Sequence, residues 1–371
     1  MADNVTYTYS PDGWDQARFL ALGGFTVVFL NYNKAQFIEQ SVASALAQDF
    51  PLLEMFFMDD ASTDGSGDTM ERIVREYRGR HKVTVVRNAT NKGITGQWNT
   101  VAKLATGNWF GMFCADDVAY PDRVTKSAEI AKNHPALKGF CTNGVEDNLI
   151  TGAKGRKILA DCVGLVQTGR TLLKALMFSD TAVIGATAFW HRSLFTRPLL
   201  PAPLDDSHLC WVLCAMTLGC EEPVWLLSKE VVAIKYTIGG GVSSSMRIDK
   251  RNIKNWRKMW LAKVREQRGF SGICVKTMKA VVEYLTTNTN AEVVIEAAKM
   301  ALLKEQYFSG NTCSRILLLP QLIRVALYGE IDIAMRQRLV IMCCKRLILE
   351  LFGLEVASFV RFLFKPAGKV A

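Results

Sequence analysis

Between residues 25 and 135, four apolar runs alternate with four amphipathic runs, and this alternation constrains the fold more than any other feature. GFTVVFLNYN is apolar and β-branched like a buried strand, and KAQFIEQSVASALAQ carries apolar residues at helical spacing. The same two patterns recur, with strands expected at 52–58, 82–88 and 108–117 and helices at 67–77, 95–107 and 120–135. The sequence therefore predicts an α/β fold in which helices flank a mostly parallel, Rossmann-like sheet.

Carboxylates follow two of these strands at the point where each strand ends. The pairs are Asp59–Asp60 and Asp116–Asp117, and Asn31 and Tyr32 follow the first strand in the same way. Sheets of this type bind ligands beyond the carboxyl ends of their strands. DASTDG is equally suited to an ordinary turn, so that interpretation stays open. Two acid pairs at one edge nevertheless predict a cation or a donor-rich ligand, because carboxylates held together repel one another.

The absence of phosphate-binding motifs narrows the ligand class. A dinucleotide fold needs G-x-G-x-x-G directly after the first strand, where this chain has NYNKAQF. GAKGRK near residue 152 has neither the spacing nor the Ser or Thr of a Walker loop. Without a glycine cradle, a metal ion must hold a diphosphate, and carboxylates are the ligands that Mg²⁺ and Mn²⁺ prefer. The residues thus favour a nucleotide diphosphate with a bridging cation.

Two long segments resemble the inverting family 2 glycosyltransferases of the GT-A fold. They are FTVVFLNYNKAQFIEQSVASALAQDFPLLEMFFMDDASTDGS and NKGITGQWNTVAKLATGNWFGMFCADDVAYPDRV, which carries an N-x-G loop, A-T-G before a strand, and D-D followed by P-D-R. The resemblance extends over residues 25–243, so a GT-A domain is expected at 20–244. It implies metal-dependent transfer of a sugar from a nucleotide diphosphate, UDP above all, to a saccharide or lipid-linked saccharide in bacterial-type surface polysaccharide synthesis.

The resemblance also implies roles for individual residues. Tyr32 matches the residue that packs on the nucleotide base, and Asp60 matches the acid that accepts a hydrogen bond from it. Asp116 matches an acid near the ribose and the metal, and Asp117 matches the direct ligand of a Mn²⁺ or Mg²⁺ ion. The donor-binding residues expected from the N-x-G loop are Asn91 and Gly93.

The expected catalytic base is Asp206, in LPAPLDDSHLCWVLCAMTLG, which resembles the acidic pair that heads a helix in this family. Asp206 is expected to take the proton from the acceptor hydroxyl, while a cation at Asp117 neutralises the leaving diphosphate. The spacing leaves a second interpretation open, in which Asp205 or Asp206 only caps the helix. His208 lies one turn into that helix, where packing is favoured over a role as base.

Two positions depart from the family pattern. The N-x-G loop usually continues to Arg-Asn but here reads Trp98–Asn99, and Gly239 stands where a His often follows the closing strand. Each departure removes a donor or metal contact unless another residue supplies it. For Trp98, packing between helix and sheet is favoured over stacking on a substrate. These changes leave an inactive sugar-nucleotide-binding scaffold as one alternative; a polyisoprenyl-phosphate glycosyltransferase is another.

Positive charge is concentrated in the C-terminal third of the chain. Of 45 Lys and Arg, 22 lie in residues 245–371, against 10 of the 35 Asp and Glu. A basic α-helical domain is expected there, with Trp256 and Trp260 one helical turn apart. An anionic membrane surface is favoured as its partner over a bundle packed on the catalytic domain. Nucleic acid is not expected, because no nucleic-acid motif appears.

The start of the chain and its cysteines bear on the compartment. MADNVTYTYSPDGWDQARF lacks the pattern of a signal peptide, and no uninterrupted apolar run reaches about 18 residues. A cytoplasmic protein, peripheral at the inner face of the membrane, is expected, with its 10 Cys as reduced thiols. Cys210, Cys214 and Cys220 lie near His208, but without a second CxxC pair inert thiols are favoured over a zinc site.

Overall fold

The computed structural model divides the chain into two compact units, Met1–Ser245 and Met246–Ala371. In the first unit it describes residues 5–149, 152–158, 165–169, 172, 183, 185–195 and 223–237. In the second it describes helical residues at 279, 282–283, 286–287, 299, 302–303, 306–307 and 318–323. The domain roles predicted for 20–244 and 245–371 remain predictions, and the account below concerns the first unit.

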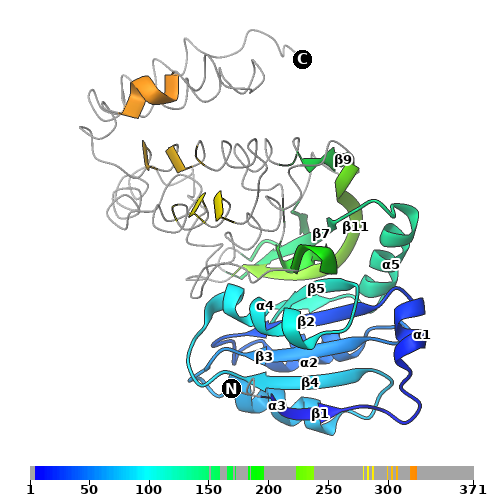
Figure 1. The fold of residues 1–371 in the computed structure, drawn as a ribbon. Coiled ribbons are helices and arrows are strands. Elements are labelled where there is room, and N and C mark those ends of the chain that lie inside the picture. The colour runs from blue at the N-terminus through cyan, green and yellow to red at the C-terminus, as the bar shows by residue number, and fades with distance from the viewer. Residues whose placement is uncertain are drawn as a thin grey trace. The chain divides into compact units, whose positions relative to one another are not determined.

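Four parallel strands form the centre of the sheet, in the order β4-β3-β2-β5 (Figure 1). They are β2 (Phe25–Asn31), β3 (Glu54–Asp59), β4 (Lys82–Arg87) and β5 (Trp109–Cys114). The helices that follow them are α2 (Ile38–Leu46), α3 (Ser66–Glu76), α4 (Gly93–Leu104) and α5 (Arg123–Asn133). The predicted fourfold alternation is confirmed, because each of these segments carries the apolar period of its own element.

Further strands extend this centre on both sides and make the sheet mixed. The full order is β1-β4-β3-β2-β5-β10-β7-β11-β6, with β8 on β7 and β9 on β11. These strands are β1 (Val5–Tyr9), β6 (Asp117–Ala119), β7 (Gly139–Asn148), β8 (Arg156–Lys157), β9 (Leu165–Thr168), β10 (Ala188–His191) and β11 (Pro223–Thr237). β11 runs parallel to β7, whereas β1, β6, β8, β9 and β10 pair antiparallel.

The core lies between the sheet and its helices. β2 and β3 are buried along their whole length, as expected for strands covered on both faces. Helix α2 buries Ile38, Val42 and Ala45 against them, and each large apolar side chain so buried contributes about 1.5–3 kcal/mol. At Gly111 a Cβ atom would lie 2.3 Å from the ring of Phe189, so only glycine lets β5 and β10 approach there.

The shorter elements of the unit complete its ends. Helix α1 (Gln16–Ala21) precedes β2, and two 3₁₀ turns, η1 (Gly185–Thr187) and η2 (Arg192–Phe195), flank β10. Within the described residues, none of the helices combines the length and apolar character that crossing a bilayer requires.

Candidate functional site

The carboxyl ends of the parallel strands meet at one edge of the sheet. Asn31 lies opposite Asp59 in the β2–β3 register, Asp59 lies opposite Arg87 on β4, and Leu30 lies opposite Cys114 on β5. The polar residues after each strand are therefore brought to the same edge, as parallel strands require. Both predicted acid pairs start from this edge.

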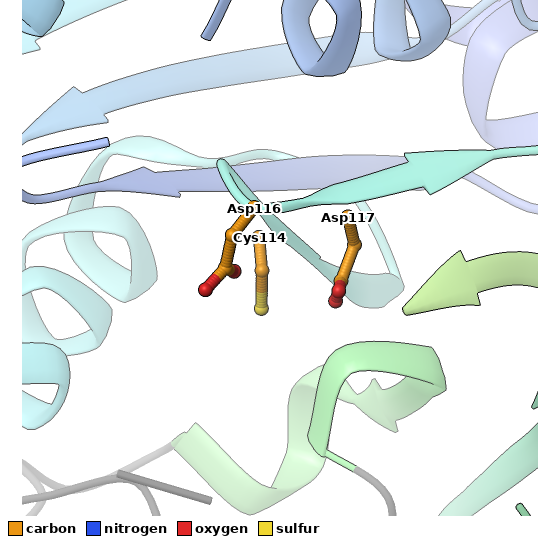
Figure 2. A group of neighbouring side chains, drawn as sticks. All are labelled: Cys114, Asp116 and Asp117. Carbon is orange, nitrogen blue, oxygen red and sulfur yellow. The ribbon is translucent and has the colours of Figure 1, made fainter. Parts of the chain in front are cut away.

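Three potential ligands gather at the end of β5: Cys114, Asp116 and Asp117, here called the acidic turn. One ligand atom of each lies within 4.8 Å of the others, and Figure 2 shows the three side chains pointing to the same side of the ribbon. Asp117 is buried, and the other two are half-buried. Two carboxylates and a thiol at this spacing fit a divalent cation that accepts both oxygen and sulfur ligands.

The backbone around the acidic turn is held on both sides. The Ala115 N–H donates to the Leu30 carbonyl at 3.0 Å, which ties the turn to β2. Asp117 then begins β6, which pairs with β11 so that Asp117 lies opposite Lys235. Cys114 is a residue of the site that the sequence analysis did not single out. Cys114 could have been identified from the sequence, because it lies at the end of an apolar run and two residues before Asp116.

Two cations border the acidic turn. The Lys34 Nζ atom lies 2.7 Å from Asp116 Oδ2. Arg123 is buried at the start of α5, donates from Nη2 to the Met112 carbonyl at 2.6 Å, and lies over the Phe113 ring. Burial lowers the pKa of Arg123 to about 10, against the opposing effect of negative charge at Cys114 and Asp117. The guanidinium thus stays positive at neutral pH and favours anionic groups in the turn.

Asp60 holds the loop that leads into helix α4. Its Oδ1 atom accepts hydrogen bonds from Asn88 Nδ2 at 2.9 Å and Lys92 N at 2.8 Å, and its Oδ2 atom accepts from Gly93 N at 2.8 Å. Asn91 Oδ1 also accepts from Gly93 N, and Gly93 has a left-handed backbone with φ +68°. A buried carboxylate here satisfies free amides at a helix N-terminus. The structure therefore brings together Asp60 and both residues expected from the N-x-G loop.

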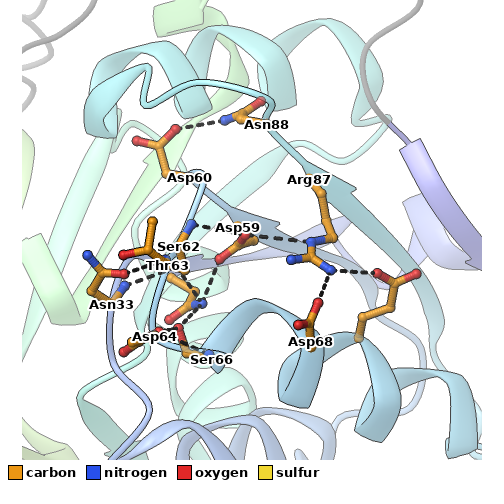
Figure 3. A network of polar contacts seen from close by, with 12 residues as sticks. Asn33, Asp59, Asp60, Ser62, Thr63, Asp64, Ser66, Asp68, Arg87 and Asn88 are labelled. Atoms are coloured by element: carbon orange, nitrogen blue, oxygen red, sulfur yellow. Dashed lines mark hydrogen bonds and ion pairs between the residues drawn. The ribbon is translucent and has the colours of Figure 1, made fainter.

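The segment DASTDG is bound to the loop after β2 (Figure 3). Asn33 Oδ1 accepts from Thr63 N at 2.8 Å, Ser62 Oγ accepts from Asn33 N at 3.0 Å, and Asp64 Oδ2 accepts from Ala35 N at 2.8 Å. Partial burial raises the pKa of Asp64, but hydrogen bonds from the next serine and from Ala35 hold it below its ordinary value. Asp64 is thus a turn residue, and these hydrogen bonds join the two loops.

Asp59 belongs to the framework beneath these loops (Figure 3). It is buried, accepts from Asn31 Nδ2 at 2.8 Å and Ser62 N at 3.3 Å, and lies 3.6 Å from Arg87 Nε. These donors come from β2, β4 and the loop itself. The first acid of the pair Asp59–Asp60 therefore fastens neighbouring strands together.

Two aromatic residues named from the sequence lie in different surroundings. Tyr32 follows β2 at the edge and is 46% exposed, so its ring is accessible. Trp98 is fully buried and stacks on Phe195 with ring centroids 5.4 Å apart. The packing interpretation of Trp98 is confirmed. His191, the last residue of β10, packs edge-on against Trp109 and contacts Ser193.

Several predicted residues lie outside the part of the chain that the structure describes. They are Asp205, Asp206, His208, Cys210, Cys214, Cys220 and Gly239, together with Trp256 and Trp260 of the basic region. Their predicted roles stay predictions.

The residues that form this edge of the sheet match a known protein family. The model of the family described as "Glycosyl transferase family 2" matches residues 26–195, which contain β3 to β5, all but the first residue of β2, the acidic turn and both loops. The chain carries a family 2 glycosyltransferase domain at residues 26–195. The family 2 domain has the GT-A fold, since TarS 1-349 from S. aureus in complex with UDP-GlcNAc superposes with a TM-score of 0.50. That match covers 88% of this chain and 91% of the TarS chain at 15% sequence identity.

Several curated glycosyltransferases match a part of this chain. The succinoglycan biosynthesis protein ExoO of Rhizobium meliloti is 30% identical over 106 residues, 29% of each chain. WfaP of Escherichia coli, a UDP-Glc:alpha-D-GlcNAc-diphosphoundecaprenol beta-1,3-glucosyltransferase, is 24% identical over 128 residues, 34% of this chain and 49% of its own. For the first curated relatives, the match spans about a third of their length.

Proposed function

We propose that this protein transfers a sugar from a nucleotide diphosphate, with UDP as the nucleotide, to a saccharide or lipid-linked saccharide hydroxyl, with inversion at the anomeric carbon. The observation that carries the proposal is the acidic turn, with its ligand atoms within 4.8 Å, at the edge that also carries Tyr32 and Asp60. The UDP-GlcNAc bound to TarS and the UDP-Glc donor named for WfaP support UDP.

Two residues, Tyr32 and Asp60, support a donor site at this edge. The exposed Tyr32 ring offers a face on which a base can stack. Asp60 accepts from three donors of its own chain, and a carboxylate has acceptor sites for about four. Because Asp60 is only 1% exposed, contact with the base requires the loop 88–93 to shift. We assign that loop, including Asn91 and Gly93, to donor binding.

Asp116 and Asp117 would hold Mn²⁺ or Mg²⁺, with Cys114 beside them. Bound there, the ion supplies the positive charge that neutralises a leaving diphosphate. Arg123 stabilises this site, because its buried positive charge favours the ionised carboxylates that a cation requires. Asp206, outside the described residues, is proposed to remove the proton from the acceptor hydroxyl.

The acceptor and the membrane are a further part of the proposal. WfaP acts on a diphosphoundecaprenol-linked sugar, and residues 245–371 carry 22 Lys and Arg against 10 Asp and Glu. We propose a lipid-linked acceptor and a peripheral position on the anionic inner face of a membrane. Sedimentation with phosphatidylglycerol vesicles should exceed that with phosphatidylcholine vesicles at low salt. Equal recovery with both would contradict this part alone.

The test of the central proposal measures release of UDP from UDP-sugars with Mn²⁺ and an acceptor extract. Asp117→Asn should lower the rate by about 10³-fold, because a metal ligand is lost. Asp206→Asn should lower it similarly while UDP binding persists. Asp68→Asn is the matched control, an acid with a 78% exposed side chain on α3, and its rate should equal that of the wild type.

The outcome also separates the alternatives. A wild type that binds UDP but releases none faster than Asp117→Asn would leave only the inactive scaffold. Transfer to polyprenyl phosphate in place of a saccharide hydroxyl would favour the polyisoprenyl-phosphate enzyme.

A further inference from the structure

Lys34 places an ammonium group directly on the acidic turn. Its Nζ atom lies 2.7 Å from Asp116 Oδ2, and the two side chains are 23% and 24% exposed. The residues lie 82 positions apart, on the loops that follow β2 and β5. The contact therefore joins two loops of the candidate site, and its partial exposure leaves room for the lysine to leave.

Hydrogen bonds hold the backbone of Lys34 in place. Its carbonyl accepts from Phe37 N at 2.9 Å and Ile38 N at 3.0 Å, at the entry to helix α2. The next residue, Ala35, donates to Asp64 Oδ2 at 2.8 Å. A lysine has four methylene groups between this anchored backbone and its charge. The ammonium can therefore move by several ångströms while the loop stays in place.

A divalent cation and this ammonium compete for the same carboxylate. The cation site of the proposed function uses Asp116, and a positive charge in hydrogen-bond contact with Asp116 repels a second one bound there. The lysine also contacts Oδ2, one of the two oxygen atoms that Asp116 could offer to a metal ion. Binding of one cation therefore weakens the binding of the other.

We propose that Lys34 is an exchangeable counter-ion: it balances Asp116 before the cation binds, and then turns to the donor diphosphate. This inference rests on the proposed function. A diphosphate ester carries one negative charge on each phosphate, which a divalent ion balances. The departing nucleotide gains a further negative charge as the sugar–oxygen bond breaks, and a nearby ammonium stabilises it.

The test compares Lys34→Met, which keeps the stem and loses the charge, with Lys34→Arg, which keeps the charge. Electron paramagnetic resonance titration measures Mn²⁺ affinity of the donor-free protein. Lys34→Met should bind Mn²⁺ about tenfold more tightly than the wild type, because a charge-assisted competitor is gone. With Mn²⁺ saturating, its affinity for UDP should fall about tenfold. Lys34→Arg should stay near the wild type in both.

The opposite signs of these two changes separate the proposal from a structural role. A variant that merely disturbs the loops would lose affinity for both ligands, and that result overturns the proposal. Unchanged Mn²⁺ affinity in Lys34→Met also overturns it, while Mn²⁺ binding by the wild type keeps the proposed cation site intact. Failure of every variant to bind Mn²⁺ would remove the cation site of the proposed function, and the exchange with it.

Discussion

The parallel strands carry buried carboxylates at both ends, and the two ends are built on different principles. At the amino end, Glu54 begins β3 and accepts from Thr26 Oγ1 at 3.0 Å, Thr106 N at 2.8 Å and Thr106 Oγ1 at 3.1 Å. Lys82 Nζ lies 3.4 Å from the same carboxylate. All of these partners are donors from the neighbouring strands or the loop before β5. Glu54 and these partners are here called the closed end, and the Glu54 carboxylate joins the strands there.

At the carboxyl end, Asp59 after β3 also joins strands, but at the end of β5 ionisable groups face one another. Cys114, Asp116 and Asp117 bring their ligand atoms within 4.8 Å. Groups of like charge at that distance destabilise a fold, and proteins keep them where a ligand needs them. The difference predicts that substitutions at the closed end lower stability, whereas substitutions in the acidic turn alter ligand binding and activity.

The largest expected effect on stability comes from Glu54→Gln. The amide presents hydrogens to the hydroxyl and amide donors of Thr26 and Thr106 and removes the charge opposite Lys82. We expect the free energy of unfolding to fall by about 3 kcal/mol, as for other broken buried pairs. Urea denaturation measures it. Cation and UDP affinities of the folded protein should not change.

Glu76→Gln is the matched control for this substitution. Glu76 lies on α3 with a 66% exposed side chain and pairs only loosely with Arg72, at 3.5 Å. Its loss should cost less than about 0.5 kcal/mol. Equal costs for both variants would mean that the closed end contributes nothing beyond an ordinary surface pair.

The same contrast explains how far the sequence predicts the fold. The helices and strands of residues 25–135 are read from local periods, because each apolar segment is buried by its own neighbours. β1 has the sequence VTYTY, whose burial pattern is mixed, and it adds to the edge of the sheet. β7 contains five polar side chains in GFCTNGVEDN, and its partners on β10 and β11 lie far along the chain. Long-range pairing of this kind leaves no local period.

The site divides in a similar way. The acid pairs are visible from the sequence because they follow apolar runs, so their meeting at one edge follows from the parallel order. The contact of Lys34 with Asp116 joins loops 82 residues apart and has no spacing that predicts it. Asp60 looks like half of an acid pair, yet its carboxylate holds the amides of Lys92 and Gly93. Only the packing of loops on one another reveals these partners.

Acid should lower the stability of the fold through His81, which directly precedes β4 at the amino end of the strands. His81 is buried, with Nε2 3.1 Å from the Gln48 carbonyl. Burial lowers its pKa to about 4, with a further decrease from Arg80, against the hydrogen bond to Gln48. In the unfolded chain, His81 binds a proton below about pH 6.5. In the folded chain it binds this proton only below about pH 4. Stability is therefore complete above this window and is lost as the pH falls through it.

Between about pH 7 and pH 5 this loss should reach about 2 kcal/mol. His81→Phe keeps a ring beside Tyr77, with which His81 stacks, and removes the titration. Urea denaturation at both pH values should show a smaller pH dependence in this variant by that amount. The variant His134→Gln replaces the half-buried His134 after α5, and its pH dependence is measured for comparison. An identical pH dependence in wild type and His81→Phe would place the acid sensitivity elsewhere.

The smallest expected effect tests whether the acidic turn selects its ion. Cys114 adds a soft sulfur to two hard carboxylates, and Mn²⁺ tolerates such a ligand better than Mg²⁺ does. Cys114→Ser should reduce the ratio of Mn²⁺ to Mg²⁺ affinity by about threefold to tenfold, and Cys114→Asp should favour Mg²⁺ further. Thermal shift titrations with each ion measure the ratio, because a bound ion stabilises the folded state by mass action. A ratio that is the same in all three proteins would show that Cys114 lies beside the ion without binding it, and the selectivity would then rest on Asp116 and Asp117 alone.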